Sequence, residues 1–133
     1  MQSRHMSLVI PTSPERVYEF AADAANLPRW AAGLASGRVT HDGDALLLDS
    51  PMGRVRVQFV PRNSLGVLDH TVTLPSGTDV INPMRVMAHP EGAELVFTVR
   101  QIELSDAEFE RDCATVAADL ERLRDLVLAE RIG

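Results

Sequence analysis

His70 is the side chain in this sequence that is best suited to chemistry. It lies in the segment Leu68-Asp69-His70-Thr71-Val72, where strand alternation puts it on the same face as Leu68 and Val72, toward the core. An imidazole titrates near neutral pH, so His70 is a candidate general base or hydrogen-bond partner for a ligand hydroxyl or carbonyl. The competing interpretation is a core histidine bonded to the backbone or to a neighbouring side chain. Asp69 points the opposite way and is expected at the surface, so the two do not form a dyad.

Asn82 is the second candidate polar group. It shares one alternation set with Val80, Met84 and Val86, so its amide could orient a ligand carbonyl beside the adaptable apolar wall that Met84 provides. Pro83 in the same strand indicates an edge or a bulge, where Asn82 would instead satisfy backbone groups that the proline cannot. The sequence leaves both interpretations open.

Aromatic and sulfur side chains complete the set of candidate ligand contacts. Phe59 and Phe97 fall on the apolar faces of two alternating strand segments. Phe109 starts the apolar stripe of the last helix and could face either a cavity or the core. Cys113 on the same stripe is interpreted as a buried small hydrophobe, because no neighbour promotes its thiolate. For Trp30, packing of a connector against the sheet competes with stacking on a ligand.

The last third of the chain is predicted to be one amphipathic helix. Ser105 and Glu108 form the capping box that starts it. A single apolar stripe must be buried, and the concave face of a sheet is the only large partner available, which leaves room for a pocket between them. The stripe residues recur at intervals of three and four: Phe109, Cys113, Val116, Leu120, Leu123 and Val127.

The first thirty residues predict a strand, a helix, a break and a second short helix. The strand covers residues 5–10. Either Thr12 or Ser13 can cap the first helix, with Glu15 placed to close a capping box from Thr12. The sequence Asn26-Leu27-Pro28 then ends that helix before a second short turn.

Residues 34–100 predict six short antiparallel strands. Short links between the strands favour hairpins over a parallel sheet, because parallel pairing would need crossover helices. The links are clusters of turn-forming residues at 42–44, 50–53, 61–64, 75–77 and 89–92.

Composition restricts the classes of partner. The 133 residues predict one domain over 1–133, and 13 basic against 19 acidic residues argue against nucleic acid as a partner. The longest aliphatic run, residues 45–48, is far shorter than the roughly 20 residues that span a bilayer. The start lacks the apolar core of a signal peptide, although a His-Met pair in residues 1–6 is also typical of a cloning remnant. We therefore expect a cytoplasmic protein without membrane insertion.

One cysteine and four dispersed histidines predict neither a disulfide nor a metal site, and we expect no cofactor.

Two segments resemble the opening of the START-like superfamily, whose bacterial members are labelled polyketide cyclase/dehydrase-like or SRPBCC proteins. They are Val9-Ile10-Pro11-Thr12-Ser13-Pro14-Glu15-Arg16-Val17-Tyr18 and Asn26-Leu27-Pro28-Arg29-Trp30. The resemblance spans essentially the whole chain. It implies an α+β helix-grip fold, in which a seven-stranded antiparallel sheet wraps a long C-terminal helix around an internal cavity, with two short helices between the first two strands. It places Trp30 near the cavity mouth.

Three functions follow, in order of preference. The first is the binding of a small hydrophobic or aromatic metabolite in a cavity between the sheet and the last helix, which needs no catalytic constellation. The second is a metal-free polyketide cyclase or aromatase activity with His70 as acid and base. The third is a co-chaperone-like interaction module. Superfamily relatives include lipid carriers, hormone receptors, aromatase/cyclases, oxygenase domains and co-chaperone-like proteins, and a shared fold does not transfer a site. Ligand identity, catalysis and oligomeric state are left open.

Overall fold

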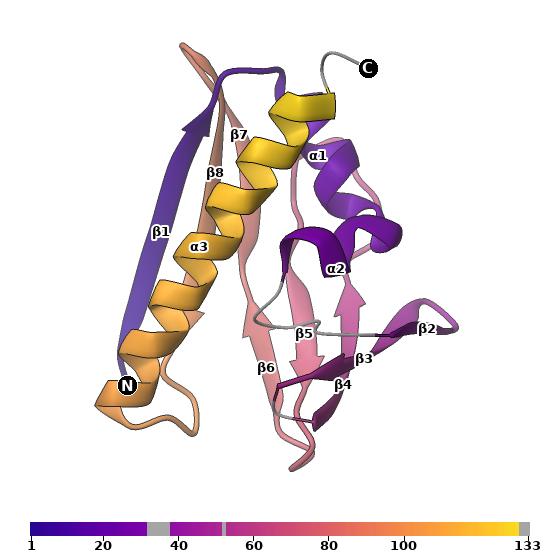
Figure 1. The fold of residues 1–133 in the computed structure, drawn as a ribbon, viewed down its shortest axis with the longest axis vertical. Helices are drawn as coiled ribbons and strands as arrows, with labels where there is room; N and C mark the ends of the chain where they lie inside the picture. The colour runs from indigo at the N-terminus through magenta and orange to yellow at the C-terminus, as the bar shows by residue number, and fades with distance from the viewer. Residues whose placement is uncertain (32–37, 52, 131–133) are drawn as a thin grey trace.

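The computed structural model describes residues 1–31, 38–51 and 53–130. Figure 1 shows the three α-helices on one side of the strands. Residues 34–37 of the predicted strand region, and Met52 of one predicted turn, lie outside the described residues. The elements in chain order are β1 (Ser3–Ile10), α1 (Pro14–Ala22), the 3-10 helix η1 (Ala24–Asn26), α2 (Leu27–Trp30), β2 (Val39–Asp42), β3 (Ala45–Ser50), β4 (Gly53–Phe59), β5 (His70–Thr73), β6 (Asp79–Asn82), β7 (Met84–His89), β8 (Gly92–Arg100) and α3 (Asp106–Glu130).

The strands form two antiparallel sheets, so the expectation of one seven-stranded sheet was wrong. One sheet has three strands in the order β1-β8-β7, and the other has five in the order β2-β3-β4-β5-β6. The break falls at Pro83, which has no N–H to give to a ladder. On one side of it Asn82 pairs with His70 of β5, and on the other side Met84 pairs with Phe97 of β8. What the sequence predicted as one strand is therefore two.

Backbone contacts hold the two sheets together across this break. The amide of Leu68 donates to the carbonyl of Met84 at 2.8 Å, and the amide of Thr98 donates to the carbonyl of Pro83 at 2.9 Å. An isolated bridge between Val67 and Arg85 continues the same pairing. The segment just before β5 thus runs along β7, and it fixes the position at which His70 enters its strand.

The long C-terminal helix begins as the sequence predicts. The amide of Ser105 donates to the Glu108 carboxylate at 2.9 Å, and the amide of Glu108 donates to the Ser105 hydroxyl at 3.2 Å, which closes the predicted capping box. The predicted stripe faces inward, since five of its six residues are buried and Val116 is half-buried. The helix packs on β1, β8, α1 and α2. Its main sheet partner is therefore the three-stranded sheet.

The N-terminal helices agree with the predicted order but differ in their cap. Ser13 is the N-cap of α1 and accepts from the amide of Arg16 at 3.3 Å. Glu15 is then the second helical residue instead of the third, so the predicted capping box from Thr12 was wrong. The predicted break is the single turn η1, which separates α1 from α2.

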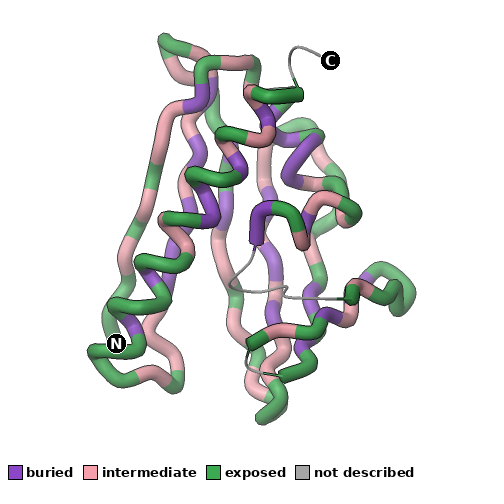
Figure 2. Tube along the Cα trace, in the orientation of Figure 1, coloured by how far each residue is buried: buried purple, intermediate pink, exposed green. Residues whose placement is uncertain are grey.

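The core lies between the sheets and the helices. Figure 2 shows buried positions alternating along the strands and recurring along α3. One connected apolar cluster joins residues of both sheets to Trp30 and the α3 stripe. None of the helices in the described residues is long and apolar enough to cross a membrane.

Candidate functional site

Three of the predicted site residues form a row across the five-stranded sheet. Phe59 of β4 pairs with His70 of β5, and His70 pairs with Asn82 of β6. Paired residues on neighbouring strands have their side chains on the same face. His70 is buried, so this is the face that the helices cover, which we call the inner face. Phe59 and Asn82 are half-buried on the same row.

Two aromatic rings enclose the imidazole of His70. The Phe59 ring stacks on it, with the ring centroids 4.6 Å apart and the planes inclined by 30°. The Phe97 ring meets it edge-on at 5.7 Å. Met84 pairs with Phe97 and is fully buried. The structure thus brings together Phe59, His70, Asn82, Met84 and Phe97, all predicted from the sequence as site residues.

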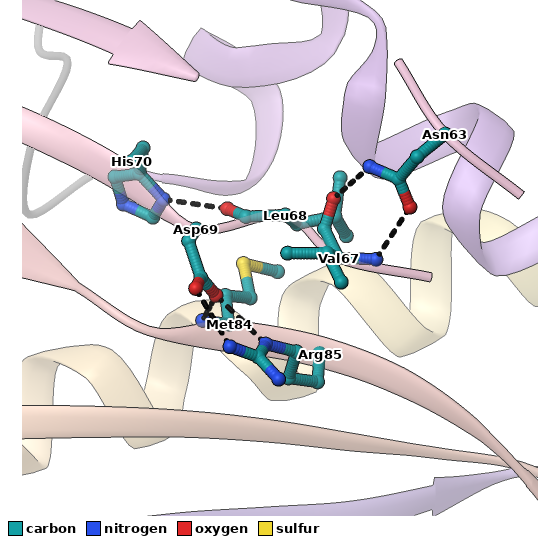
Figure 3. Close-up of polar contacts among 7 residues, drawn as sticks. All are labelled: Asn63, Val67, Leu68, Asp69, His70, Met84 and Arg85. Carbon is teal, nitrogen blue, oxygen red and sulfur yellow. Dashed lines mark hydrogen bonds and ion pairs between the residues drawn. The ribbon is translucent and has the colours of Figure 1, made fainter. Parts of the chain in front are cut away.

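One hydrogen bond fixes the imidazole. Nδ1 of His70 lies 2.9 Å from the carbonyl oxygen of Leu68 (Figure 3). Both sequence interpretations of His70 remain compatible with this geometry, because the backbone bond uses one ring nitrogen. The described residues provide no hydrogen-bond partner for the other nitrogen, Nε2. The residue as a whole retains a small exposure of 4%.

Burial sets the charge of the imidazole. Removal from water lowers the pKa of His70 below its ordinary value of 6.5, and the Leu68 carbonyl opposes this only in part. Asp69 faces the other way, as predicted, and its carboxylate accepts two bonds from Arg85, at 3.0 and 2.8 Å (Figure 3). This ion pair lowers the pKa of Asp69. His70 is therefore a neutral imidazole, and none of the described carboxylates bonds it on its own face.

The loop before β5 is held by Asn63, which sequence reasoning missed. Its amide nitrogen donates to the carbonyls of Pro61 at 3.0 Å and Val67 at 2.9 Å, and its amide oxygen accepts from the amides of Leu65 and Val67. Its backbone amide donates to the Tyr18 hydroxyl of α1 at 3.0 Å. The cluster Pro61-Arg62-Asn63-Ser64 predicted a turn, but only the tertiary fold shows that one side chain closes the whole loop.

Trp30 lies in the core, where its backbone anchors α2 to α3. It is 3% exposed, and its carbonyl accepts from Nη1 of Arg122 at 3.1 Å. The same Arg122 nitrogen donates to the buried Asp119 at 2.9 Å. The indole Nε1 is buried and has no hydrogen-bond partner among the residues that the structure describes. Asp119 was also missed, although its spacing from Val116 places it on the inner side of α3.

Phe109 and Cys113 of α3 both lie beside Arg4 of β1. The Arg4 guanidinium lies 5.2 Å from the Phe109 ring centroid and pairs with Glu110 at 2.7 Å. Cys113 is 3% exposed, and burial raises the pKa of its thiol, so the predicted role of a small core hydrophobe is favoured over reactivity. These contacts associate both residues with the three-stranded sheet.

Described residues line two hollows on the outside of the molecule. One, of about 430 Å³, runs between β1 and α3, and the other, of about 460 Å³, lies over α1 and Arg62. Neither is lined by His70 or the aromatic residues around it. No group of three or more potential metal ligands occurs among the described residues.

The neutral state of His70 predicts a pH dependence of stability. Its folded-state pKa is lowered, so between that pKa and the ordinary value the unfolded chain binds more protons than the folded chain. The stability that the neutral His70 contributes is therefore fully present above pH 6.5, and it is lost as the pH falls toward the folded-state pKa. We expect acidification from about pH 7.5 to about pH 5.5 to lower the urea midpoint less in His70→Gln than in the original chain.

His41→Gln is the matched control for this measurement, because His41 is exposed on β2. Its midpoint should fall with pH as steeply as that of the original chain. Equal slopes for all three proteins would show that His70 is not responsible.

Comparison with known proteins identifies similar folds but does not assign the chain to a family. No protein-family model matches the chain, and no curated protein matches it. Among solved structures it is similar to protein CV1439 from Chromobacterium violaceum, with 18% identity over 96% of this chain and 98% of that one, at a TM-score of 0.69. It is similar to XoxI from Bacillus cereus, with 19% identity, 96% of both chains and a TM-score of 0.67. It is also similar to Ara h 8.0201, with 11% identity, 96% and 98% coverage and a TM-score of 0.68. These likenesses support an α+β helix-grip fold with antiparallel sheets and a long C-terminal helix, and they show the fold alone.

Proposed function

We propose that the chain binds a small hydrophobic or aromatic molecule against the inner face of the sheets, beside α3, with His70 as its polar anchor. The observation that carries the proposal is the His70 environment: a buried imidazole between Phe59 and Phe97, with one nitrogen bonded to Leu68 and the other without a partner among the described residues. Ligand sites are typically apolar walls with a few placed polar groups, and this is such an arrangement.

The surrounding residues support an apolar ligand over a charged one. The inner-face neighbours of His70 are aromatic rings, a methionine and an amide, and the nearest carboxylate in sequence, Asp69, is held on the opposite face by Arg85. Burial makes the imidazole neutral. Fold likeness is compatible with this role but adds no residue to it.

The same finding favours one second candidate, a cyclase-like activity. A neutral imidazole whose second nitrogen has no partner among the described residues can accept a proton from an activated carbon or hydroxyl. His70 would be the base in such a reaction, with Asn82, its neighbour across β5 and β6, positioned to bond a carbonyl. A reaction would be recognised by a product that separates from the added molecule by chromatography, with an unchanged mass after ring closure alone and a mass lower by one water after dehydration.

The proposed site is tested by blocking it from α3. Val116 is half-buried on the inner stripe, whereas Ala114 on the same helix is exposed. We expect Val116→Trp to reduce saturable binding of the neutral probe N-phenyl-1-naphthylamine roughly tenfold or more, because the indole occupies the space of the ligand. Ala114→Trp should bind the probe as the original chain does.

Stability separates a pocket from a solid core in the same experiment. Filling empty space is tolerated, whereas overpacking a filled core costs about 1–3 kcal/mol. Probe binding that is unchanged in Val116→Trp, together with a loss of stability in that range, would contradict the proposed site. Absence of saturable binding to the original chain would contradict it as well.

A further inference from the structure

We propose that the bound molecule is a neutral hydrogen-bond donor, of the phenol or enol class, whose hydroxyl donates to Nε2 of His70. This inference rests on the proposed function and specifies its ligand. It is carried by the geometry of the imidazole and of the groups around it.

The first step is the tautomer of His70. A carbonyl oxygen can only accept, so the 2.9 Å contact with Leu68 requires that Nδ1 carry the proton. In a neutral imidazole the other nitrogen is then an acceptor. The Leu68 carbonyl is itself held in place, because the amide of the same residue donates to Met84 at 2.8 Å. The fold thus presents Nε2 as a lone pair and not as an N–H.

The second step concerns charge, because the described residues bring no anion to the inner face beside the imidazole. A second proton on the ring would need a nearby anion, but Asp69 faces away and is held by Arg85 and by the amide of Met84. The two rings that contact the imidazole, Phe59 and Phe97, are uncharged. A ligand carboxylate, ether or ketone would bring only lone pairs to Nε2, whereas a hydroxyl brings a proton.

The third step is the shape of the surroundings. Phe59 stacks along one face of the imidazole and Phe97 meets it edge-on, so the ring plane is confined and Nε2 keeps one direction. A flat, unsaturated molecule can extend this aromatic packing. Hydroxyl donors on such a skeleton are phenols and enols, which are neutral at physiological pH.

Three naphthalenes that differ only in one group test the inference by isothermal titration calorimetry at neutral pH. They are 2-naphthol, which donates, 2-methoxynaphthalene, which only accepts, and 2-naphthoate, which is an anion. We expect the naphthol to bind roughly tenfold more tightly than the methoxy compound, and the naphthoate to bind most weakly. In His70→Phe the naphthol and the methoxy compound should bind within about twofold of one another. His41→Phe, altered at an exposed histidine, should keep the original preference.

The outcomes distinguish a failure of the donor inference from a failure of the proposed binding function. Equal binding of naphthol and methoxynaphthalene, or tightest binding of naphthoate, overturns the donor inference and leaves the binding function in place. No binding of any of the three by the original chain contradicts the proposed function itself.

Nitrogen-15 NMR of the imidazole is a second test, and it uses the unaltered protein, so it does not depend on the folding of a variant. A protonated Nδ1 and an unprotonated Nε2 are expected for His70, and the opposite tautomer overturns the inference.

Discussion

Replacing Gly66 with alanine is expected to lower the free energy of unfolding by about 3–5 kcal/mol, since two separate costs fall on this position. Gly66 has a φ of +75°, in the left-handed region that residues with a Cβ rarely adopt. A Cβ atom there would also overlap the carbonyl oxygen of Val86. The Gly66 carbonyl accepts from the Val86 amide at 2.9 Å, so the backbone cannot move away without breaking that bond.

Gly43→Ala is the matched control. Gly43 has a similar φ of +62°, but a Cβ atom there would meet nothing within 4 Å. It should therefore show only the conformational cost, about 1–2 kcal/mol. Urea unfolding of both variants measures the difference, with unchanged m-values to confirm that the same transition is compared. Equal losses would show that the approach of Gly66 to β7 is not a tight constraint.

The Gly66 variant also tests how the site is positioned. Gly66 lies two residues before Leu68, whose carbonyl bonds His70, and both positions pair with β7. A displaced segment would move that carbonyl. We expect the imidazole NMR signals of His70 to shift in Gly66→Ala and to remain unchanged in Gly43→Ala.

Truncating Phe97 is expected to have the second large effect. Phe97 is 7% exposed in the core, and Phe→Ala changes at such positions typically cost about 3–5 kcal/mol. The variant also removes the ring that covers one edge of His70, which should let water in and bring the pKa of His70 back toward its ordinary value. Urea unfolding and an NMR titration of the imidazole measure these two results.

Val96→Ala is the control, because Val96 is the adjacent residue, points to the opposite face of β8 and is half-buried. It should cost less than about 1.5 kcal/mol and leave the His70 titration unchanged. A loss for Phe97→Ala as small as this would mean that Phe97 borders open space and contributes little packing.

The local elements follow from the sequence because their signals are local. Ser105 and Glu108 close the capping box that their spacing predicts, and the α3 stripe faces inward as its period requires. Strand alternation correctly put His70 on the buried face and Asp69 on the other, since side chains alternate between the faces of a strand. Pro83 predicted an edge or a bulge within one strand, whereas in the structure the strand ends there and a new one begins in the other sheet.

The sheet arrangement and the site contacts depended on the tertiary structure. Pro83 interrupts a strand wherever it lies, but only the pairing of Asn82 with β5 and of Met84 with β8 decides that two sheets result. No residue pattern in the sequence predicts three of the contacts at the site. They are the bond from His70 to Leu68, the stacking of Phe59 on His70 and the closure of the loop by Asn63. Sequence determined which face each side chain takes, because that is a property of the local backbone. Only the packing of strands against one another decided which groups meet, and therefore that His70 presents a neutral acceptor between two aromatic rings.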